Sequence, residues 1–372
     1  MTLGGVIGSS LTDNQSIATL PVSLMVVVTA LSAIPATILM KKVGRRMGSS
    51  MASLSAASAV LIGAYALHIK SFEFFVIAAA LFGINAAFSQ QYRYAAAESV
   101  DQKFVSRAIS MILLGAIGGA MLGPELVTRG RFWIESAPYA GSLISLSVLF
   151  VIQSILLMSL RAFSVQDDGN LGVNARPLGI LLRQRVFIMA MLGGTVAYGA
   201  MTFIMTATPL SMHVVDGYSM EATANVIRSH VLAMYIPSLL SGFLIEKFGL
   251  SRIMMMGALG LFLASIAGLS GQSIFSYWVA LVLLGIGWNF LYVGSTTMLT
   301  YTYKPNERFK AQGINEFCVF GVSALGSLLA GTIMYLYGWY TLVLIPIPFL
   351  IMIAVGLRMT KNETNLLLQT RT

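Results

Sequence analysis

Charged residues are scarce in this sequence. Asp, Glu, Lys and Arg make up 10% of its 372 residues, whereas hydrophobic residues make up 57%. A soluble domain carries about 25% charged residues, which cover its surface against water. The mean hydropathy of +0.81 fits this contrast. The composition therefore excludes an ordinary soluble protein and predicts an integral membrane protein, long enough for two bundles of about six helices each.

The chain also has only one cysteine, Cys318, and three histidines that lie far apart, His68, His213 and His230. A single cysteine excludes a disulfide framework and a CxxC metal site. The HExxH, GxSxG and GxxxxGK[ST] patterns are absent, so metal-dependent hydrolysis, serine hydrolysis and ATP-driven pumping have no supporting motif. We expect no metal, no cofactor and no enzymatic activity; a membrane enzyme is the weakest alternative.

Long apolar runs, separated by short polar gaps, make up most of the sequence. Many runs approach the 20 residues that a helix needs to cross a bilayer. The predicted spans cover about residues 19–40, 48–68, 73–96, 107–128, 138–160, 186–210, 220–245, 253–271, 276–299, 311–335 and 340–357. Met1–Leu11 is apolar but reaches only about 16 Å as a helix, so we expect it to be the end of a truncated first helix. It lacks the basic start and the cleavage site typical of a signal peptide.

One long polar connection, Arg161–Arg185, separates the fifth predicted span from the sixth. It contains Asp167-Asp168-Gly-Asn and Arg176-Pro177, which are typical of turns and linkers. We therefore expect an N-terminal transmembrane bundle at 1–160, a cytoplasmic linker at 161–185, a C-terminal bundle at 186–357 and a cytoplasmic tail at 358–372.

The chain has a net charge of +9, and its basic residues lie where they would orient a membrane protein in the bilayer. Lys and Arg gather in alternate gaps between the apolar runs, and only Lys70, Arg129 and Arg131 lie in the gaps of the other side. The positive-inside rule then places the linker and the C-terminus in the cytoplasm. The expected partners are the lipid bilayer and a small molecule, and we expect no nucleic acid.

A short charged turn between two apolar runs carries the most specific pattern. It reads Gly242-Phe-Leu-Ile-Glu246-Lys247-Phe-Gly249-Leu-Ser-Arg252. This stretch resembles the Gly-x-x-x-Asp-Arg-x-Gly-Arg-Arg signature of the major facilitator superfamily of secondary transporters. In that family the acidic residue and the basic cluster form a latch between helices. The resemblance therefore implies a gating role for Gly242, Glu246, Lys247, Gly249 and Arg252.

A second copy of this turn lies about 205 residues earlier. It keeps Gly44, Arg45 and Arg46, but Thr37 stands in place of the leading glycine and Lys41 in place of the acid. Parallel repeats of this kind are what the two halves of the family imply. We expect Gly44, Arg45 and Arg46 to belong to a gate whose acidic latch residue is missing.

The resemblance implies an all-α polytopic membrane protein with the superfamily fold, which has two parallel-repeat bundles of six helices. About eleven full spans are expected here, because the first helix is truncated. The implied function is secondary active transport of a small molecule by alternating access, with protons as a candidate coupling ion. The expected form is a multi-pass monomer in the bacterial inner membrane. A non-transporting remnant or sensor with the same fold is the alternative, and the substrate stays open.

A further short pattern, Gly119-x-x-x-Gly123-Pro124, resembles half of the antiporter signature of the family. The Gly-Gly pair that should follow is replaced by Val127-Thr128. Small residues four positions apart also serve plain helix packing. Both interpretations of Gly119, Gly123 and Pro124 remain open, and packing is the favoured one.

Polar residues inside apolar spans are costly and are therefore candidates for function. The candidates for the substrate cavity are Arg93, Gln90, Gln91, Asn85, Asn289 and Thr296. The candidates for proton coupling are His230, Glu316 and Glu125. The alternatives are an Arg93 that reaches the headgroups, a His230 satisfied between helices, a Glu316 paired with a cytoplasmic Arg and a Glu125 that faces water.

Overall fold

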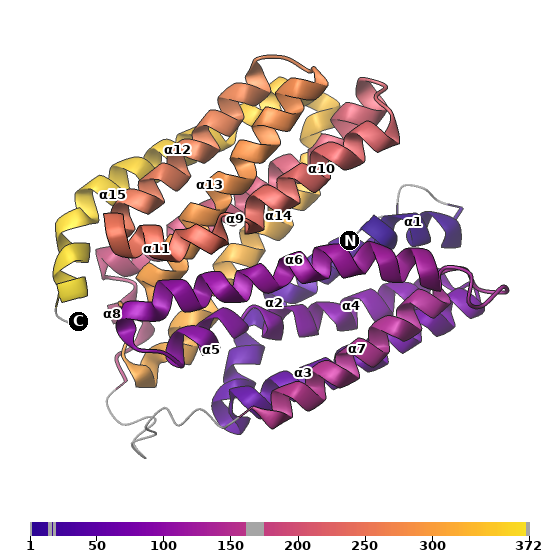
Figure 1. The fold of residues 1–372 in the computed structure, drawn as a ribbon, viewed down its shortest axis with the longest axis horizontal. Coiled ribbons are helices and arrows are strands. Elements are labelled where there is room, and N and C mark those ends of the chain that lie inside the picture. The colour runs from indigo at the N-terminus through magenta and orange to yellow at the C-terminus, as the bar shows by residue number, and fades with distance from the viewer. Residues whose placement is uncertain (1, 14–16, 18–19, 161–174, 370–372) are drawn as a thin grey trace. The chain divides into compact units, whose positions relative to one another are not determined.

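The computed structural model describes residues 2–13, 17, 20–160 and 175–369, without the side chains of residues 2–6, 120, 121, 124, 128, 368 and 369. Every regular element among these residues is a helix (Figure 1). The main helices are α1 Thr2–Leu11, α2 Leu20–Val43, α3 Arg45–His68, α4 Phe72–Ser89, α5 Tyr92–Glu98, α6 Val105–Gly130, α7 Ala140–Ser159, α8 Leu178–Leu181, α9 Arg185–Pro209, α10 Met220–Tyr235, α11 Ser238–Phe248, α12 Leu250–Leu269, α13 Ile274–Thr300, α14 Arg308–Leu344 and α15 Pro346–Gln369.

The helices form two compact units. The first comprises Met1–Tyr92, Gly118–Gln166 and the short stretch Gln312–Phe317 of α14. The second comprises Arg93–Ile117, Asp167–Ala311 and Cys318–Thr372. The first part of α6 thus belongs to the second unit, and its remainder belongs to the first. The expected bundle boundaries at 160 and 186 stay a prediction.

Nine helical segments within the described residues are long and apolar enough to cross a membrane. Eight of them match one predicted span each. The ninth, Pro305–Leu367, has 63 residues, which is about 95 Å of helix and far more than one bilayer core needs. Gly338, with a φ of 75°, interrupts it at the border of the last two predicted spans. α6, with 26 residues, matches the remaining predicted span.

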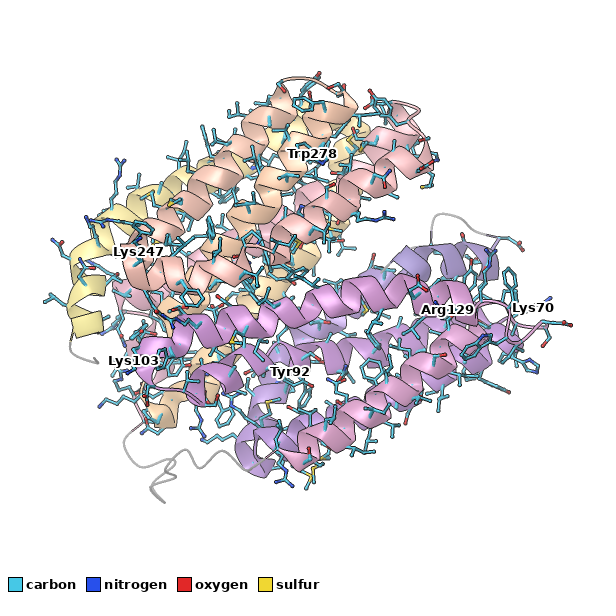
Figure 2. All side chains as sticks on the ribbon, in the orientation of Figure 1. Lys70, Tyr92, Lys103, Arg129, Lys247 and Trp278 are labelled. Carbon is cyan, nitrogen blue, oxygen red and sulfur yellow. The ribbon has the colours of Figure 1, made fainter. Side chains whose placement is uncertain are left out.

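In each unit, the labelled basic residues lie together at one end. Figure 2 shows Lys70 and Arg129 at the same end of the first unit. In the second unit, Lys103 and Lys247 lie at one end and Trp278 lies toward the other (Figure 2). The assignment of these residues to two opposite sides of the membrane stays a prediction.

Both charged turns are single glycines between two helices. Gly44 separates α2 from α3 with φ 84° and ψ 156°, and Gly249 separates α11 from α12 with φ 90° and ψ 148°. This backbone region is essentially restricted to glycine, because a Cβ would clash with the neighbouring carbonyl groups. The repeat that was inferred from the sequence is therefore present in the backbone.

A second pair of glycines, one in each unit, occupies equivalent positions. Gly83 and Gly285 each lie eleven residues after the first residue of their helix, α4 and α13. A Cβ on Gly83 would lie 2.5 Å from the carbonyl oxygen of Met25 in α2. A Cβ on Gly285 would lie 2.8 Å from the carbonyl oxygen of His230 in α10. Each glycine therefore lets two helix backbones approach closely.

Candidate functional sites

The predicted gating motif of the second unit forms an ion pair between α6 and α11. Arg107 donates to the carboxylate of Glu246, and both side chains are partly exposed. The guanidinium of Arg107 also lies 4.1 Å from the ring centre of Phe243. Sequence reasoning identified Glu246 but not its partner, because Arg107 lies 139 residues away in the chain.

Close backbone contact supports this ion pair. A Cβ on Gly242 would lie 2.8 Å from the Cα of Arg107. The hydroxyl of Ser106 donates to the carbonyl oxygen of Gly242 at 3.3 Å, and the hydroxyls of Ser110 and Ser241 share a hydrogen bond of 3.0 Å. The leading glycine of the motif thus permits the approach of α6 to α11 that brings Arg107 to Glu246.

The other members of this turn have local contacts. Arg252 donates to the carbonyl oxygen of Phe248 at 3.4 Å, which ties the start of α12 to the end of α11. The ammonium group of Lys247 lies 5.4 Å from the ring centre of Phe248. Both basic residues therefore contact the turn itself.

In the predicted gating motif of the first unit, side-chain amides stand in place of a carboxylate. Arg45 donates to the side-chain oxygen of Gln312 at 2.6 Å and to that of Gln91 at 3.4 Å. Lys41 has an exposed side chain, whereas Thr37 is buried. Arg46 is half-buried. Gln91, predicted as a cavity residue, is thus a hydrogen-bond partner of Arg45 in this structure.

Arg93 is buried among aromatic rings. Its side chain is 2% exposed, and its guanidinium carbon lies 4.7 Å from the ring centres of both Tyr94 and Tyr292. A guanidinium over an aromatic face is stabilised by the ring quadrupole. Whether Arg93 binds substrate or reaches the headgroups stays a prediction. Its neighbour Gln90 is half-buried and lies in the first unit.

The two candidate asparagines differ in their hydrogen bonds. Asn289 donates to the carbonyl oxygen of Met234 at 2.7 Å and to the hydroxyl of Ser238 at 2.6 Å. It thereby bridges the interruption between α10 and α11, where Pro237 supplies no N–H. Asn85 is 3% exposed, and its side-chain oxygen has no hydrogen-bond partner among the described residues. Thr296 is buried within α13.

The three candidates for proton coupling occupy different environments. His230 is fully buried, and its Nδ1 donates to the carbonyl oxygen of Leu281 at 2.7 Å. Glu316 is 1% exposed and accepts a hydrogen bond of 2.9 Å from Asn315. Glu125 is exposed and pairs with Arg129, one turn later in α6. Such an exposed pair contributes little.

At Gly119 and Gly123 of α6, an added Cβ would meet no described atom within 4 Å. The side chain of Pro124 lies outside the described residues. The choice between packing and an antiporter role for this motif therefore stays a prediction.

The end of the linker is anchored by an ion pair that sequence reasoning missed. Glu307, in the turn before α14, is fully buried and accepts hydrogen bonds from Arg176 Nε at 2.7 Å and from its terminal nitrogen at 2.6 Å. The backbone N–H groups of Arg176 and Lys304 add two more, at 3.0 and 2.9 Å. The Glu307 hydrogen bond raises the pKa of Arg176. An acid four residues before a predicted span gives no sign of a partner that lies 131 residues away.

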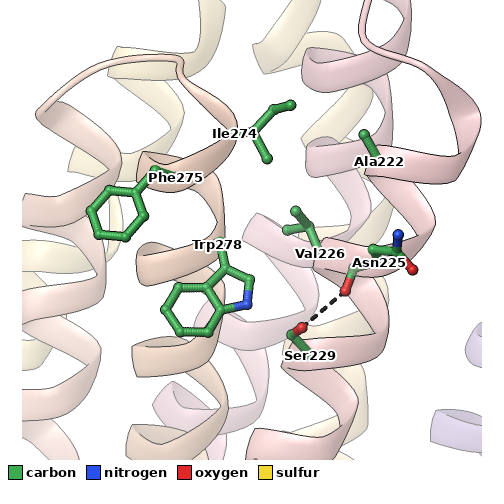
Figure 3. A pocket seen from close by; sticks show the side chains of 7 residues that line it. All are labelled: Ala222, Asn225, Val226, Ser229, Ile274, Phe275 and Trp278. Atoms are coloured by element: carbon green, nitrogen blue, oxygen red, sulfur yellow. Dashed lines mark hydrogen bonds between the residues drawn. The ribbon is translucent and has the colours of Figure 1, made fainter.

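An open pocket of about 530 Å³ lies between α10 and the start of α13 in the second unit (Figure 3). It is lined by Ala222, Asn225, Val226, Ser229, Ile274, Phe275 and Trp278. The Ser229 hydroxyl donates to the carbonyl oxygen of Asn225 at 3.0 Å (Figure 3). None of the substrate or proton candidates lines this pocket.

Repeated membrane-spanning helices, joined by matching charged turns and carrying buried polar residues, define a multi-pass membrane transporter. The model of the Major Facilitator Superfamily matches residues 190–366. The riboflavin transporter RfnT of Brucella anthropi is 38% identical over 362 residues, which cover 96% of this chain and 91% of that protein. The uncharacterized MFS-type transporter YddS of Bacillus subtilis is 28% identical over 357 residues, with 90% and 80% covered. The chain belongs to the Major Facilitator Superfamily.

Solved structures have the same fold. The fucose:proton symporter FucP of E. coli superposes with a TM-score of 0.67 at 17% identity, with 95% of each chain covered. The human organic anion transporter MFSD10 gives a TM-score of 0.69 at 16% identity, with 94% of this chain and 87% of that one covered. At such low identity these neighbours establish the fold alone, and it is the predicted all-α polytopic fold.

Proposed function

We propose that this protein transports riboflavin across the bacterial inner membrane. The observation that carries the proposal is the 38% identity to the riboflavin transporter RfnT, which extends over 96% of this chain. Riboflavin combines an aromatic tricyclic ring with an uncharged, hydroxyl-rich chain. The second unit offers matching chemistry, since aromatic side chains and buried hydroxyls lie together on α9 and α13.

The direct test is uptake of radiolabelled riboflavin by a bacterial riboflavin auxotroph that lacks its own transporter. Cells that express this chain should accumulate the label and grow on a low riboflavin supply, whereas cells with an empty vector should not. An assay with everted membrane vesicles then measures riboflavin transport in the direction opposite to uptake. Absence of flux in both directions, with the protein present and folded in the membrane, would contradict the proposal and favour a non-transporting remnant or sensor.

The mechanism we propose is alternating access between the halves 1–160 and 186–357 of a monomer, with the C-terminus in the cytoplasm. The support is the repeat of the Gly44 and Gly249 turns and the excess of Lys and Arg on one side of the sequence. No catalytic step is part of this mechanism, so we propose that the protein is not an enzyme.

For proton coupling we propose Glu316 as the first residue to examine. Glu316 is 1% exposed within an apolar span, where an ionisable side chain is costly and is therefore a candidate for function. Glu316→Gln should abolish the accumulation of riboflavin that a pH gradient drives and retain exchange of riboflavin across the membrane. The matched control is Glu363→Gln, which removes the exposed partner of Arg185. Accumulation equal to that of the control would remove Glu316 from the mechanism.

A further inference from the structure

Five aromatic rings form one cluster in the second unit. Tyr198 of α9 lies edge-on to Trp288, Tyr292 and Phe320, with ring centres 5.5, 5.2 and 5.0 Å apart. Trp288 stacks on Tyr292 at 4.9 Å, and Tyr235 meets Trp288 edge-on at 5.9 Å. Both arrangements are the ones that aromatic pairs prefer. The five rings thus form a connected group on α9, α10, α13 and α14.

Three of these rings, those of Tyr198, Trp288 and Tyr235, come from the middle of their membrane-crossing segments. Tyr198 is near the centre of α9 (Arg185–Pro209), and Trp288 is near the centre of α13 (Ile274–Thr300). Tyr235 is near the centre of the α10–α11 segment Met220–Phe248. These three rings therefore lie near the middle of their helices, and secondary transporters bind their substrates near the bilayer midplane.

The cluster adjoins an interrupted helix. Tyr235 is the last residue of α10, and Ile236 and Pro237 separate it from Ser238, where α11 begins. Asn289, which follows Trp288, holds both sides of the interruption through Met234 and Ser238.

Two buried donors of this region have no hydrogen-bond partner among the described residues. Trp288 is 1% exposed, and its indole N–H has no acceptor. Thr195 is 8% exposed, and its hydroxyl has no partner either. Thr195 precedes Tyr198 by three positions, which places the two on neighbouring faces of α9. Buried donors are almost always satisfied in proteins, so an acceptor from a ligand fits here.

Exposure within the cluster is uneven. Trp288 and Tyr292 are buried, whereas Tyr198 and Tyr235 are half-buried. The two half-buried tyrosines are therefore the side that a ligand reaches first. Arg93 adds a positive charge at the other end, 4.7 Å from the ring centre of Tyr292.

We infer that Trp288, Tyr198 and Tyr235 bind the isoalloxazine ring of riboflavin within the second unit. This inference depends on the proposed function. The planar ring lies against the two tyrosines, and the indole N–H of Trp288 donates to one of its carbonyl or ring-nitrogen acceptors. The ribityl chain, which carries only hydroxyl groups, takes no part in this subsite. The site therefore selects a flat heteroaromatic ring with acceptors at its edge.

The test is equilibrium binding of riboflavin to the purified full chain in detergent, with lumichrome and ribitol as competitors. Lumichrome, which has the tricyclic ring without the chain, should displace riboflavin, whereas ribitol should not. Tyr198→Leu and Tyr235→Leu should each weaken riboflavin binding about tenfold or more, because each removes one aromatic contact. Trp288→Phe keeps a ring and removes the N–H, and it should weaken binding by a similar factor.

Trp278→Phe is the matched control, because Trp278 belongs to the same helix and lies 42% exposed in the separate pocket of Figure 3. It should leave binding unchanged. The emission of the bound flavin is a second readout, since stacking on tyrosine quenches it. In Tyr198→Leu and Tyr235→Leu the residual bound flavin should be brighter, which a general loss of folding does not produce.

The outcomes separate the two proposals. If the unaltered chain binds riboflavin and all three cluster variants bind it as the control does, the ring site is wrong and the proposed function stands. If the unaltered, monodisperse chain binds neither riboflavin nor lumichrome, the proposed function fails, and the ring site fails with it.

Discussion

Gly44 and Gly249 occupy the same place in two helical hairpins, one in each unit, and their φ and ψ angles agree within about 10°. Their surroundings differ. Near Gly249, Glu246 pairs with Arg107, whereas near Gly44 the amide oxygens of Gln312 and Gln91 accept from Arg45. The comparison shows that the two turns share a backbone geometry, while the contact beside it is ionic in one unit and made by amides in the other.

The residue that leads each motif shows a second difference. Gly242 lets the backbone of α11 approach the backbone of α6 at Arg107. Thr37 stands at the corresponding position of α2, and the glycine is on the other side of the contact, at Gly313 of α14, whose Cβ would lie 2.5 Å from the Thr37 hydroxyl. Both contacts require one small residue, but they do not require it on the same helix.

Alanine at the two turn glycines should have the largest effect and should test how alike the turns are. At a φ of 84° or 90° with ψ near 150°, a Cβ is strained by up to about 3 kcal/mol. Gly44→Ala and Gly249→Ala should therefore lower the unfolding temperature in detergent by similar amounts. Gly179→Ala, at a helical glycine where a Cβ would meet no described atom within 4 Å, is the control. A strong effect at only one turn would show that the turns are not equivalent.

The eleven predicted spans and both charged turns could be derived from the sequence, because hydropathy, glycine and charge act locally. The partners of the polar residues could not. Arg107 and Glu246 are 139 residues apart, and Arg176 and Glu307 are 131 apart, so their pairing depends on helix packing. Asn289 was a sound candidate as a buried amide. Its bond to Met234 depends on the interruption at Pro237, and apolar periodicity does not show that interruption.

Alanine at Gly242 should have the next largest effect, about 2 kcal/mol, because its Cβ would meet the backbone of Arg107, which no side-chain movement can clear. Gly313→Ala should cost about half as much, since its Cβ meets the side chain of Thr37. The double variant Thr37→Ala/Gly313→Ala should recover the unfolding temperature and riboflavin uptake that Gly313→Ala loses. A parallel recovery of Gly242→Ala by Ser106→Ala would contradict the distinction between a backbone and a side-chain obstacle.

The smallest effect should come from the charges that distinguish the two turns. The side chains of Arg107 and Glu246 are 37% and 26% exposed, so solvent screens their attraction and Glu246→Gln should cost about 1 kcal/mol or less. Lys41→Gln, at the corresponding exposed position of the first turn, should cost nothing measurable. A double-mutant cycle with Arg107→Gln isolates the pairwise energy in the second turn. That energy should shrink at high salt, because partly exposed ion pairs are screened. If Glu246→Gln changes neither stability nor riboflavin uptake relative to Lys41→Gln, the ionic latch has no measurable role, and close packing at Gly242 is what distinguishes the second gate.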